Sequence, residues 1–92
     1  MTFEVLWNQK ALDNLKKIDK PIGKKLFAKV IGYLSKDPIN LGKPLKNNMS
    51  GLWRYRLGDY RVIYTVDLES KTIKAIEAGH RRGIYLRQGK AK

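Results

Sequence analysis

The spacing of hydrophobic residues changes soon after the start of the chain. Residues 2–7 alternate, with Phe3, Val5 and Trp7 on one face, which is the pattern of a β-strand. After Asn8, a residue type that caps helices well, apolar positions recur every three or four residues and predict a helix of about ten residues. The apolar stripe of this helix consists of Ala11, Leu12, Leu15 and Ile18.

A second stretch with helical spacing begins at Pro21, because proline is tolerated in the first turn of a helix. Asp37-Pro38 is expected to end it, since the residue before a proline avoids the α region. Residues 38–51 contain two prolines and two glycines and predict a loop, with a short strand near residues 45–47. The stripe expected to face the core consists of Ile22, Leu26, Phe27, Val30, Ile31 and Leu34.

Three strands are predicted in the second half of the chain. Strands 52–57 and 60–66 flank the pair Gly58-Asp59, which suits a tight hairpin turn, and strand 72–79 follows a turn at 67–71. The order β-α-α-β-β-β predicts an α+β fold, with the two helices packed on one face of a mostly antiparallel sheet. A chain of 92 residues fits a single domain covering residues 1–92.

Strand alternation divides the hairpin into two faces. Trp53, Tyr55 and Leu57 share one side, and Val62, Tyr64 and Val66 suit the same core. Arg54 and Arg56 point the other way, as do Arg61, Ile63 and Thr65. Because the helices cover the core face, we expect the arginines to line the uncovered, concave face of the sheet.

The charge of the chain narrows the class of partner. The net charge is +12, from 20 Lys and Arg against 8 Asp and Glu, which suits an anionic partner: nucleic acid, an anionic membrane or an acidic protein. The absence of cysteine excludes disulfides and thiolate sites, and a single histidine makes a zinc site unexpected. No apolar run approaches the length of a membrane span, and residues 1–8 do not read as a signal peptide, so we expect a cytoplasmic protein.

Five arginines fall within 29 positions near the aromatic strands, although a sheet has no need of them. Guanidinium groups match phosphate, because the fork reaches two oxygens and stays charged at physiological pH. RNA cleavage by the ribose 2′-hydroxyl also needs proton transfer, for which His80 and Tyr85 are the candidates. The lysines on the helices are expected to form a solvated face or to attract partners by non-specific electrostatic steering. Trp53, Tyr55 and Tyr64 are expected to lie in the core. The five arginines are Arg54, Arg56, Arg61, Arg81 and Arg82.

Two segments carry a resemblance to a known family. GLWRYRLGDYRVIY, at residues 51–64, and AGHRRGIY, at residues 78–85, resemble the RelE/ParE toxin superfamily, and the RelE branch most closely. The resemblance covers nearly the whole chain and implies a RelE-like fold. It also implies an endoribonuclease that cuts messenger RNA in the ribosomal A site without metal or other cofactor.

The resemblance also assigns residues and partners. It implies catalytic roles for Arg54, Arg56, Arg61, Arg81 and Tyr85. The family pattern has lysines at the first two positions, one of them the suspected general base, so part of the proton transfer is assigned here to His80. The further basic residues expected to bind RNA are Lys43, Lys46, Arg82 and Arg87. The implied partners are an acidic RelB-like antitoxin, messenger RNA and the ribosome, with DNA contacted only through the antitoxin complex and no membrane.

Two other functions fit the same superfamily. A ParE-like toxin inhibits DNA gyrase by binding and has no nuclease activity. An inactive relative would act with its antitoxin as a nucleic-acid-binding repressor. ParE-like members generally lack the full set of basic residues and tyrosine that this chain has, which favours the nuclease. Cleavage of message in a translation extract would separate the nuclease from both alternatives.

Overall fold

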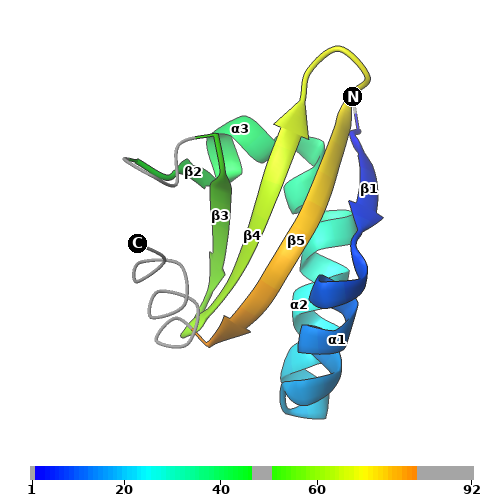
Figure 1. Ribbon diagram of the computed structural model, residues 1–92, viewed down its shortest axis with the longest axis vertical. Coiled ribbons are helices and arrows are strands. Elements are labelled where there is room, and N and C mark those ends of the chain that lie inside the picture. Colours follow the sequence, from blue (N-terminus) through cyan, green and yellow to red (C-terminus); the bar gives the residue numbers. More distant parts are fainter. Residues whose placement is uncertain (1, 47–50, 81–92) are drawn as a thin grey trace.

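The protein is a five-stranded sheet with two long helices packed on one face (Figure 1). The computed structural model describes residues 2–46 and 51–80. The elements in chain order are β1 (Glu4–Trp7), α1 (Gln9–Lys17), α2 (Lys20–Gly32), the 3₁₀ turn η1 (Leu34–Lys36), α3 (Pro38–Leu41), β2 (Lys43–Pro44), β3 (Trp53–Leu57), β4 (Tyr60–Asp67) and β5 (Thr72–His80). The predicted α+β class and the predicted hairpin are confirmed.

The strand order across the sheet is β1-β5-β4-β3-β2. The pairs β2–β3, β3–β4 and β4–β5 are antiparallel, and β1 pairs parallel with β5. The mostly antiparallel sheet expected from the sequence is therefore confirmed. The chain passes from β1, at one edge of the sheet, to β2, at the other edge, through α1, α2, η1 and α3.

The first helix begins where the sequence predicts. The side chain of Asn8 accepts a hydrogen bond from the backbone N–H of Ala11 at 2.8 Å, which satisfies one free donor of the first turn. The second helix begins at Lys20, with Pro21 in its first turn, where a missing N–H costs nothing. α2 ends at Gly32 rather than at Asp37, and the chain continues through η1.

The prediction for residues 38–51 is wrong in two respects. Pro38 begins a short helix, because the carboxylate of Asp37 accepts from the backbone N–H of Asn40 at 3.3 Å and proline suits the first helical position. The short strand is at Lys43–Pro44 rather than near residues 45–47, and it pairs with Arg54 and Trp53 of β3. Residue 47 lies outside the described residues.

The core lies between the α1–α2 hairpin and the sheet. Leu26 and Val30 of α2 are buried against Val62, Tyr64 and Ile73 of the sheet. Phe27 and Ile31, which the periodicity assigned to the core, are instead 40% and 42% exposed. The buried stripe of α2 runs through Gly23, Leu26 and Val30, so the next positions around the helix face outward. The ring of Phe27 stacks on Trp7, with 4.9 Å between centroids.

Tyr64 ties the α3–β2 segment to the sheet. Its hydroxyl donates to the backbone oxygen of Pro38 at 2.7 Å, and its side chain is fully buried. Burial raises the pKa of the Tyr64 phenol well above its ordinary value, because the charged form would lose its solvation. Gly42 lies against this ring so closely that an added Cβ would overlap the hydroxyl oxygen.

Candidate functional site

Four basic side chains share the face of the sheet away from α1 and α2. Arg56 pairs directly with Arg61, Arg54 pairs with Ile63, and Lys43 pairs with Arg54. Cross-strand partners point to the same face of a sheet, and the alternate residues Tyr55 and Val62 lie in the helix-facing core. We call Lys43, Arg54, Arg56 and Arg61 the arginine face. Its composition confirms the face assignment made from strand alternation.

Two guanidinium groups converge on the turn between β3 and β4. The Nε of Arg56 donates to the backbone oxygen of Gly58 at 3.2 Å. The Nη1 of Arg61 lies 3.4 Å from the same oxygen and 3.4 Å from the oxygen of Tyr60. Like charges directly opposite each other destabilise a strand pair. The oxygen of Gly58, which both guanidinium groups approach, offsets part of the repulsion between Arg56 and Arg61.

The arginine face is less open than the sequence analysis expected. Arg56 is exposed, but Arg61 is only 3% exposed, and its neighbours Ile63 and Glu77 are fully buried. Arg61 directs its guanidinium at the carbonyls of Gly58 and Tyr60, close to the sheet. The expectation that this face is uncovered is therefore wrong at Arg61.

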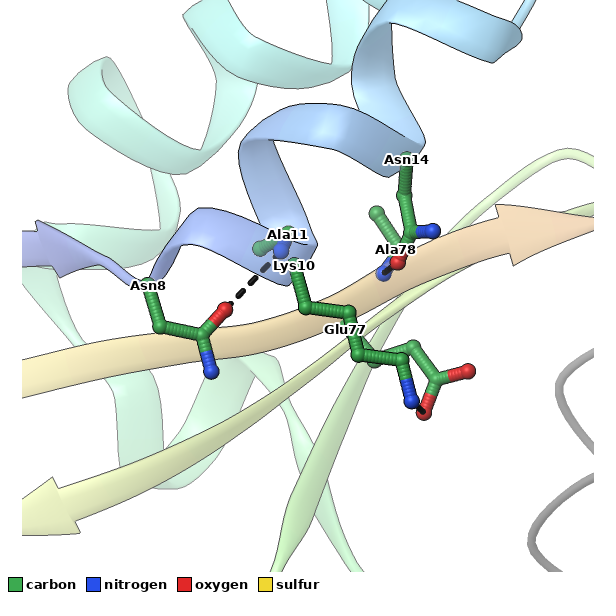
Figure 2. A network of polar contacts seen from close by, with 6 residues as sticks. All are labelled: Asn8, Lys10, Ala11, Asn14, Glu77 and Ala78. Atoms are coloured by element: carbon green, nitrogen blue, oxygen red, sulfur yellow. Dashed lines mark hydrogen bonds and ion pairs between the residues drawn. The ribbon is translucent and has the colours of Figure 1, made fainter.

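Glu77 is a buried acid on the arginine face that the sequence analysis missed. It pairs with Ile63, whereas Ala75 pairs with Tyr64, so Ile76 is an extra residue in the ladder. This bulge reverses the alternation of β5 and turns Glu77 to the arginine face. The Oε1 of Glu77 lies 3.5 Å from the Nζ of Lys10 in α1. Figure 2 draws this ion pair. Strict alternation would have placed Glu77 in the core with Ala75, so no sequence signal located it.

Beyond the end of β1, Asn8 and helix α1 lie along the edge of β5 and hydrogen-bond to its backbone. The last β1 pair is Trp7 with Ala75, and the backbone N–H of Asn8 then donates to the oxygen of Ala75 at 3.0 Å. Further along, the backbone N–H of Ala78 donates to the Oδ1 of Asn14 at 3.1 Å (Figure 2). A side-chain amide thus satisfies a strand donor that no neighbouring strand reaches.

The structure does not bring His80 to the arginine face. His80 pairs with Tyr60, and its ring meets the ring of Tyr60 edge-on, with 5.5 Å between centroids. Gly79 pairs with Arg61, so His80, the next residue, points to the opposite face. There it lines a hollow together with Asn14 of α1. His80 therefore lies on the face of the sheet opposite the arginine face.

The remaining predicted residues divide into two groups. Lys46 is exposed just beyond β2, next to Leu45, whose N–H donates to the oxygen of Leu52 at 2.8 Å. The others lie outside the described residues: Arg81, Arg82, Tyr85 and Arg87.

The sequence also matches a family of known proteins. Residues 5–85 match the family described as the ParE toxin of type II toxin-antitoxin systems, parDE. The chain belongs to this toxin family. Within it, the toxin is 32% identical over 87 residues to toxin RelG of Mycobacterium tuberculosis, covering 95% of this chain and all of RelG. It is 35% identical to toxin RelE of the same organism, over 82% of this chain and 77% of RelE.

Solved structures agree with this assignment. The toxin is similar to a chain of the RelBE2 toxin-antitoxin complex of Mycobacterium tuberculosis, with a TM-score of 0.84, 30% identity, and coverage of 88% of this chain and all of that one. A mutant of the Escherichia coli toxin RelE in the free state shares the fold, with a TM-score of 0.74, 20% identity, and coverage of 96% and 93%. The RelE-like fold implied by the resemblance is confirmed. Within the described ranges, no helix of the toxin is long and apolar enough to cross a membrane.

Proposed function

We propose that this toxin is an endoribonuclease that cuts messenger RNA on the ribosome and so stops translation. Its similarity to proteins named RelG and RelE supports this activity. The cross-strand pair of Arg56 and Arg61, with Arg54 on the same face, is the observation that carries the proposal. The place of action is the cytoplasm, where ribosomes and messages meet.

The proposed reaction is an internal transfer at phosphorus. The ribose 2′-oxygen forms a bond to the adjacent phosphorus, the bond from phosphorus to the 5′-oxygen breaks, and a 2′,3′-cyclic phosphate remains. The 2′-hydroxyl proton leaves to a base, and the departing 5′-oxygen gains a proton. Charge accumulates on the equatorial oxygens in the transition state, and fixed guanidinium groups stabilise it there. Arg56 and Arg61 supply these groups from neighbouring strands.

Proton transfer requires a residue other than the arginines of the arginine face. Arginine remains protonated and is a poor shuttle, so Arg54 and Arg56 serve as charge rather than as base. Arg81 and Tyr85, which the resemblance places in the same site, lie outside the described residues, and their roles stay predictions from the sequence. His80 faces the helix side of the sheet, away from the arginine face, so we do not place it in the proton transfer.

A pair of matched variants tests the nuclease. Arg56→Gln removes one positive charge from the arginine face, and Lys25→Gln removes one from an exposed position of α2. We expect Arg56→Gln to slow cleavage of ribosome-bound message by at least about tenfold, because about 1.4 kcal/mol of transition-state stabilisation corresponds to a factor of ten. The measurement is primer extension on message in a translation extract, with both variants confirmed to be folded by circular dichroism.

Cleavage near the wild-type rate in Lys25→Gln would show that net charge alone is not responsible. Equal cleavage by wild type and folded Arg56→Gln would remove the arginine pair from the mechanism. If wild-type toxin cut no message, on or off ribosomes, the nuclease itself would be ruled out.

Inhibition of DNA gyrase is the second candidate function. It is favoured by one finding, the match of residues 5–85 to the family described as ParE toxin. A gyrase supercoiling assay with purified toxin separates the two activities, because a nuclease leaves supercoiling unchanged. An inactive relative, the third interpretation, would neither cut message nor inhibit gyrase, and would bind operator DNA only in complex with its antitoxin.

The proposed protein partner is an acidic, RelB-like antitoxin. Similar chains are found in complexes named RelBE, including the one from Mycobacterium tuberculosis. A hollow of about 520 Å³ between α1 and α2 suits such a partner, because its walls are mostly apolar and its rim is positively charged. An amphipathic helix with acidic flanks would match both features. Leu15, Ile18 and Phe27 line the hollow, with Lys16, Lys20 and Lys24 around them.

A further inference from the structure

Two charged side chains are buried within the described residues, and they have opposite signs. Arg61 and Glu77 are both almost completely shielded from solvent. Burying a charge is costly unless an opposite charge or strong hydrogen bonds accompany it. Arginine cannot escape this cost by losing its proton. A buried carboxylate close to Arg61 would therefore stabilise it, and Glu77 is the buried carboxylate of the described chain.

The pairing of β4 with β5 places the two side chains next to each other on the arginine face. Arg61 is opposite Gly79. Glu77, two residues before Gly79 on β5, is opposite Ile63. Arg61 and Glu77 are therefore diagonal neighbours, which in antiparallel strands lie about 7–8 Å apart and within reach of a long side chain. Gly79 has no side chain that could separate them.

The bulge in β5 gives Glu77 this position. The extra residue Ile76 reverses the alternation, and without it Glu77 would share the core face with Ala75. A bulge interrupts the hydrogen-bond ladder, and bulges are common next to active sites, where they re-aim a side chain. In this sheet the bulge brings a carboxylate to the face that carries the cross-strand arginine pair.

The carbonyl contacts of Arg61 are long for a charged donor. Its Nη1 lies 3.4 Å from the oxygens of both Gly58 and Tyr60, whereas charge-assisted hydrogen bonds are typically about 2.7–2.9 Å. Contacts of this length hold a guanidinium group weakly. Arg56, directly opposite on β3, also repels Arg61. A fixed carboxylate on the same face offsets this repulsion and sets the direction of the buried guanidinium.

Glu77 also has a partner in helix α1, which offers a simpler explanation of its burial. Its Oε1 forms an ion pair with the Nζ of Lys10 at 3.5 Å. The Lys10 side chain is more than half exposed, and ion pairs with exposed lysines contribute little to stability. The pair with Lys10 can be removed without changing Glu77, so the two explanations can be separated by experiment.

We propose that Glu77 is a positioning residue, whose carboxylate holds the guanidinium of Arg61 in the direction needed at the scissile phosphate. This inference rests on the proposed nuclease function, in which Arg56 and Arg61 stabilise the transition state. A guanidinium that is fixed before the substrate arrives needs no rearrangement during the reaction. Loss of the carboxylate should therefore lower the rate of cleavage more than it weakens binding of the message.

Two variants test this role in single-turnover cleavage of ribosome-bound message. Glu77→Gln keeps the shape of the side chain and removes its charge, and Lys10→Gln removes only the ion pair with α1. In Glu77→Gln we expect the maximal rate to fall at least about tenfold, with the half-saturating toxin concentration unchanged within about twofold. In Lys10→Gln both quantities should stay within about twofold of wild type.

A third variant keeps the buried charge and suits the case in which Glu77→Gln does not fold. Glu77→Asp draws the carboxylate back by one methylene group. We expect it to lower the maximal rate and to leave the half-saturating concentration unchanged, because the contact with Arg61 is lengthened while the charge remains. Circular dichroism confirms that each variant is folded.

Nuclear magnetic resonance tests the contact without any substrate. The Nε–Hε signal of Arg61 in a ¹H–¹⁵N spectrum is identified by its loss in Arg61→Gln. We expect this signal to move in Glu77→Gln and to stay in place in Lys10→Gln. A signal that does not move in Glu77→Gln would overturn the proposal, whatever the rate of cleavage.

The kinetic outcomes separate the role of Glu77 from the nuclease itself. Wild-type cleavage with an unchanged rate in folded Glu77→Gln would overturn this role and leave the nuclease standing. Equal losses in Glu77→Gln and Lys10→Gln would also overturn it, because Glu77 would then serve only to hold α1 to the sheet. If wild-type toxin cut no message, the nuclease would fail, and the role of Glu77 in cleavage with it.

Discussion

The buried hydroxyl of Tyr64 gives the protein a measurable response to alkaline pH. The pKa of Tyr64 is raised by burial, so the folded state keeps this phenol neutral at a pH where the unfolded chain ionises it. A raised folded-state pKa contributes stability that is fully present below about pH 10 and is lost as the pH rises above that value. Tyr64→Phe removes this dependence, together with the hydrogen bond to Pro38.

We therefore expect Tyr64→Phe to lower the free energy of unfolding by about 1–3 kcal/mol at neutral pH, because a buried carbonyl loses its donor. The gap between wild type and variant should narrow from about pH 10 upward, by at most about 1.4 kcal/mol per pH unit. Urea unfolding at about pH 8 and about pH 11 measures it. Tyr33→Phe, which removes an exposed hydroxyl, is the control and should show no gap at pH 8. A constant gap for Tyr64→Phe would contradict the raised pKa.

At the scale of elements, the α3–β2 segment is held to the sheet by close contact at Gly42. An added Cβ there would overlap the hydroxyl of Tyr64 and lie 3.0 Å from the backbone oxygen of Arg54. We expect Gly42→Ala to destabilise the toxin by about 1–3 kcal/mol through overpacking. Gly32→Ala, at the end of α2 with no heavy atom within 4 Å of the added Cβ, should stabilise by about 0.5–1 kcal/mol. Chemical denaturation of both variants gives the comparison, and equal effects would contradict the close contact.

The same scale shows what the sequence could and could not predict. The hairpin at Gly58-Asp59 and the helix start at Asn8 depend on local turn and capping chemistry, so both were predictable. The arginine face followed from simple alternation along β3 and β4. The position of Glu77 did not, because one extra residue at Ile76 reverses the alternation and leaves no mark in composition.

Two other differences from the sequence prediction, the exposure of Phe27 and Ile31 and the face occupied by His80, are set by tertiary contacts. Phe27 and Ile31 have helical spacing suitable for a core, but the core stripe of α2 is narrower than the apolar stripe. His80 follows the arginine strands closely in sequence, yet strand parity places it behind the sheet with Tyr60. Nearness in sequence to a basic cluster is therefore a poor guide to which face a residue occupies.

At the scale of the whole molecule, net charge governs the attraction of partners. A charge of +12 on a chain of 92 residues favours an acidic antitoxin through long-range attraction, which salt screens over about 10 Å at 0.1 M. We expect the dissociation constant for the antitoxin to rise at least about tenfold between about 0.1 M and about 0.5 M sodium chloride. Titration calorimetry across this range is the measurement, with sucrose at matched osmolality as the control. An affinity that ignores salt would mean that apolar contacts in the α1–α2 hollow dominate.

The pairing of β1 with β5 has a consequence for how the toxin is made. Glu4 is translated well before its partner in the sheet, Thr72. Contacts between such distant positions form slowly, because a long loop must close before they contribute any stability. A nascent chain can therefore build the α1–α2 hairpin early but cannot complete its sheet until residues 72–80 have been synthesised. The ribosome that makes the toxin therefore has no complete toxin fold beside it until it has translated β5.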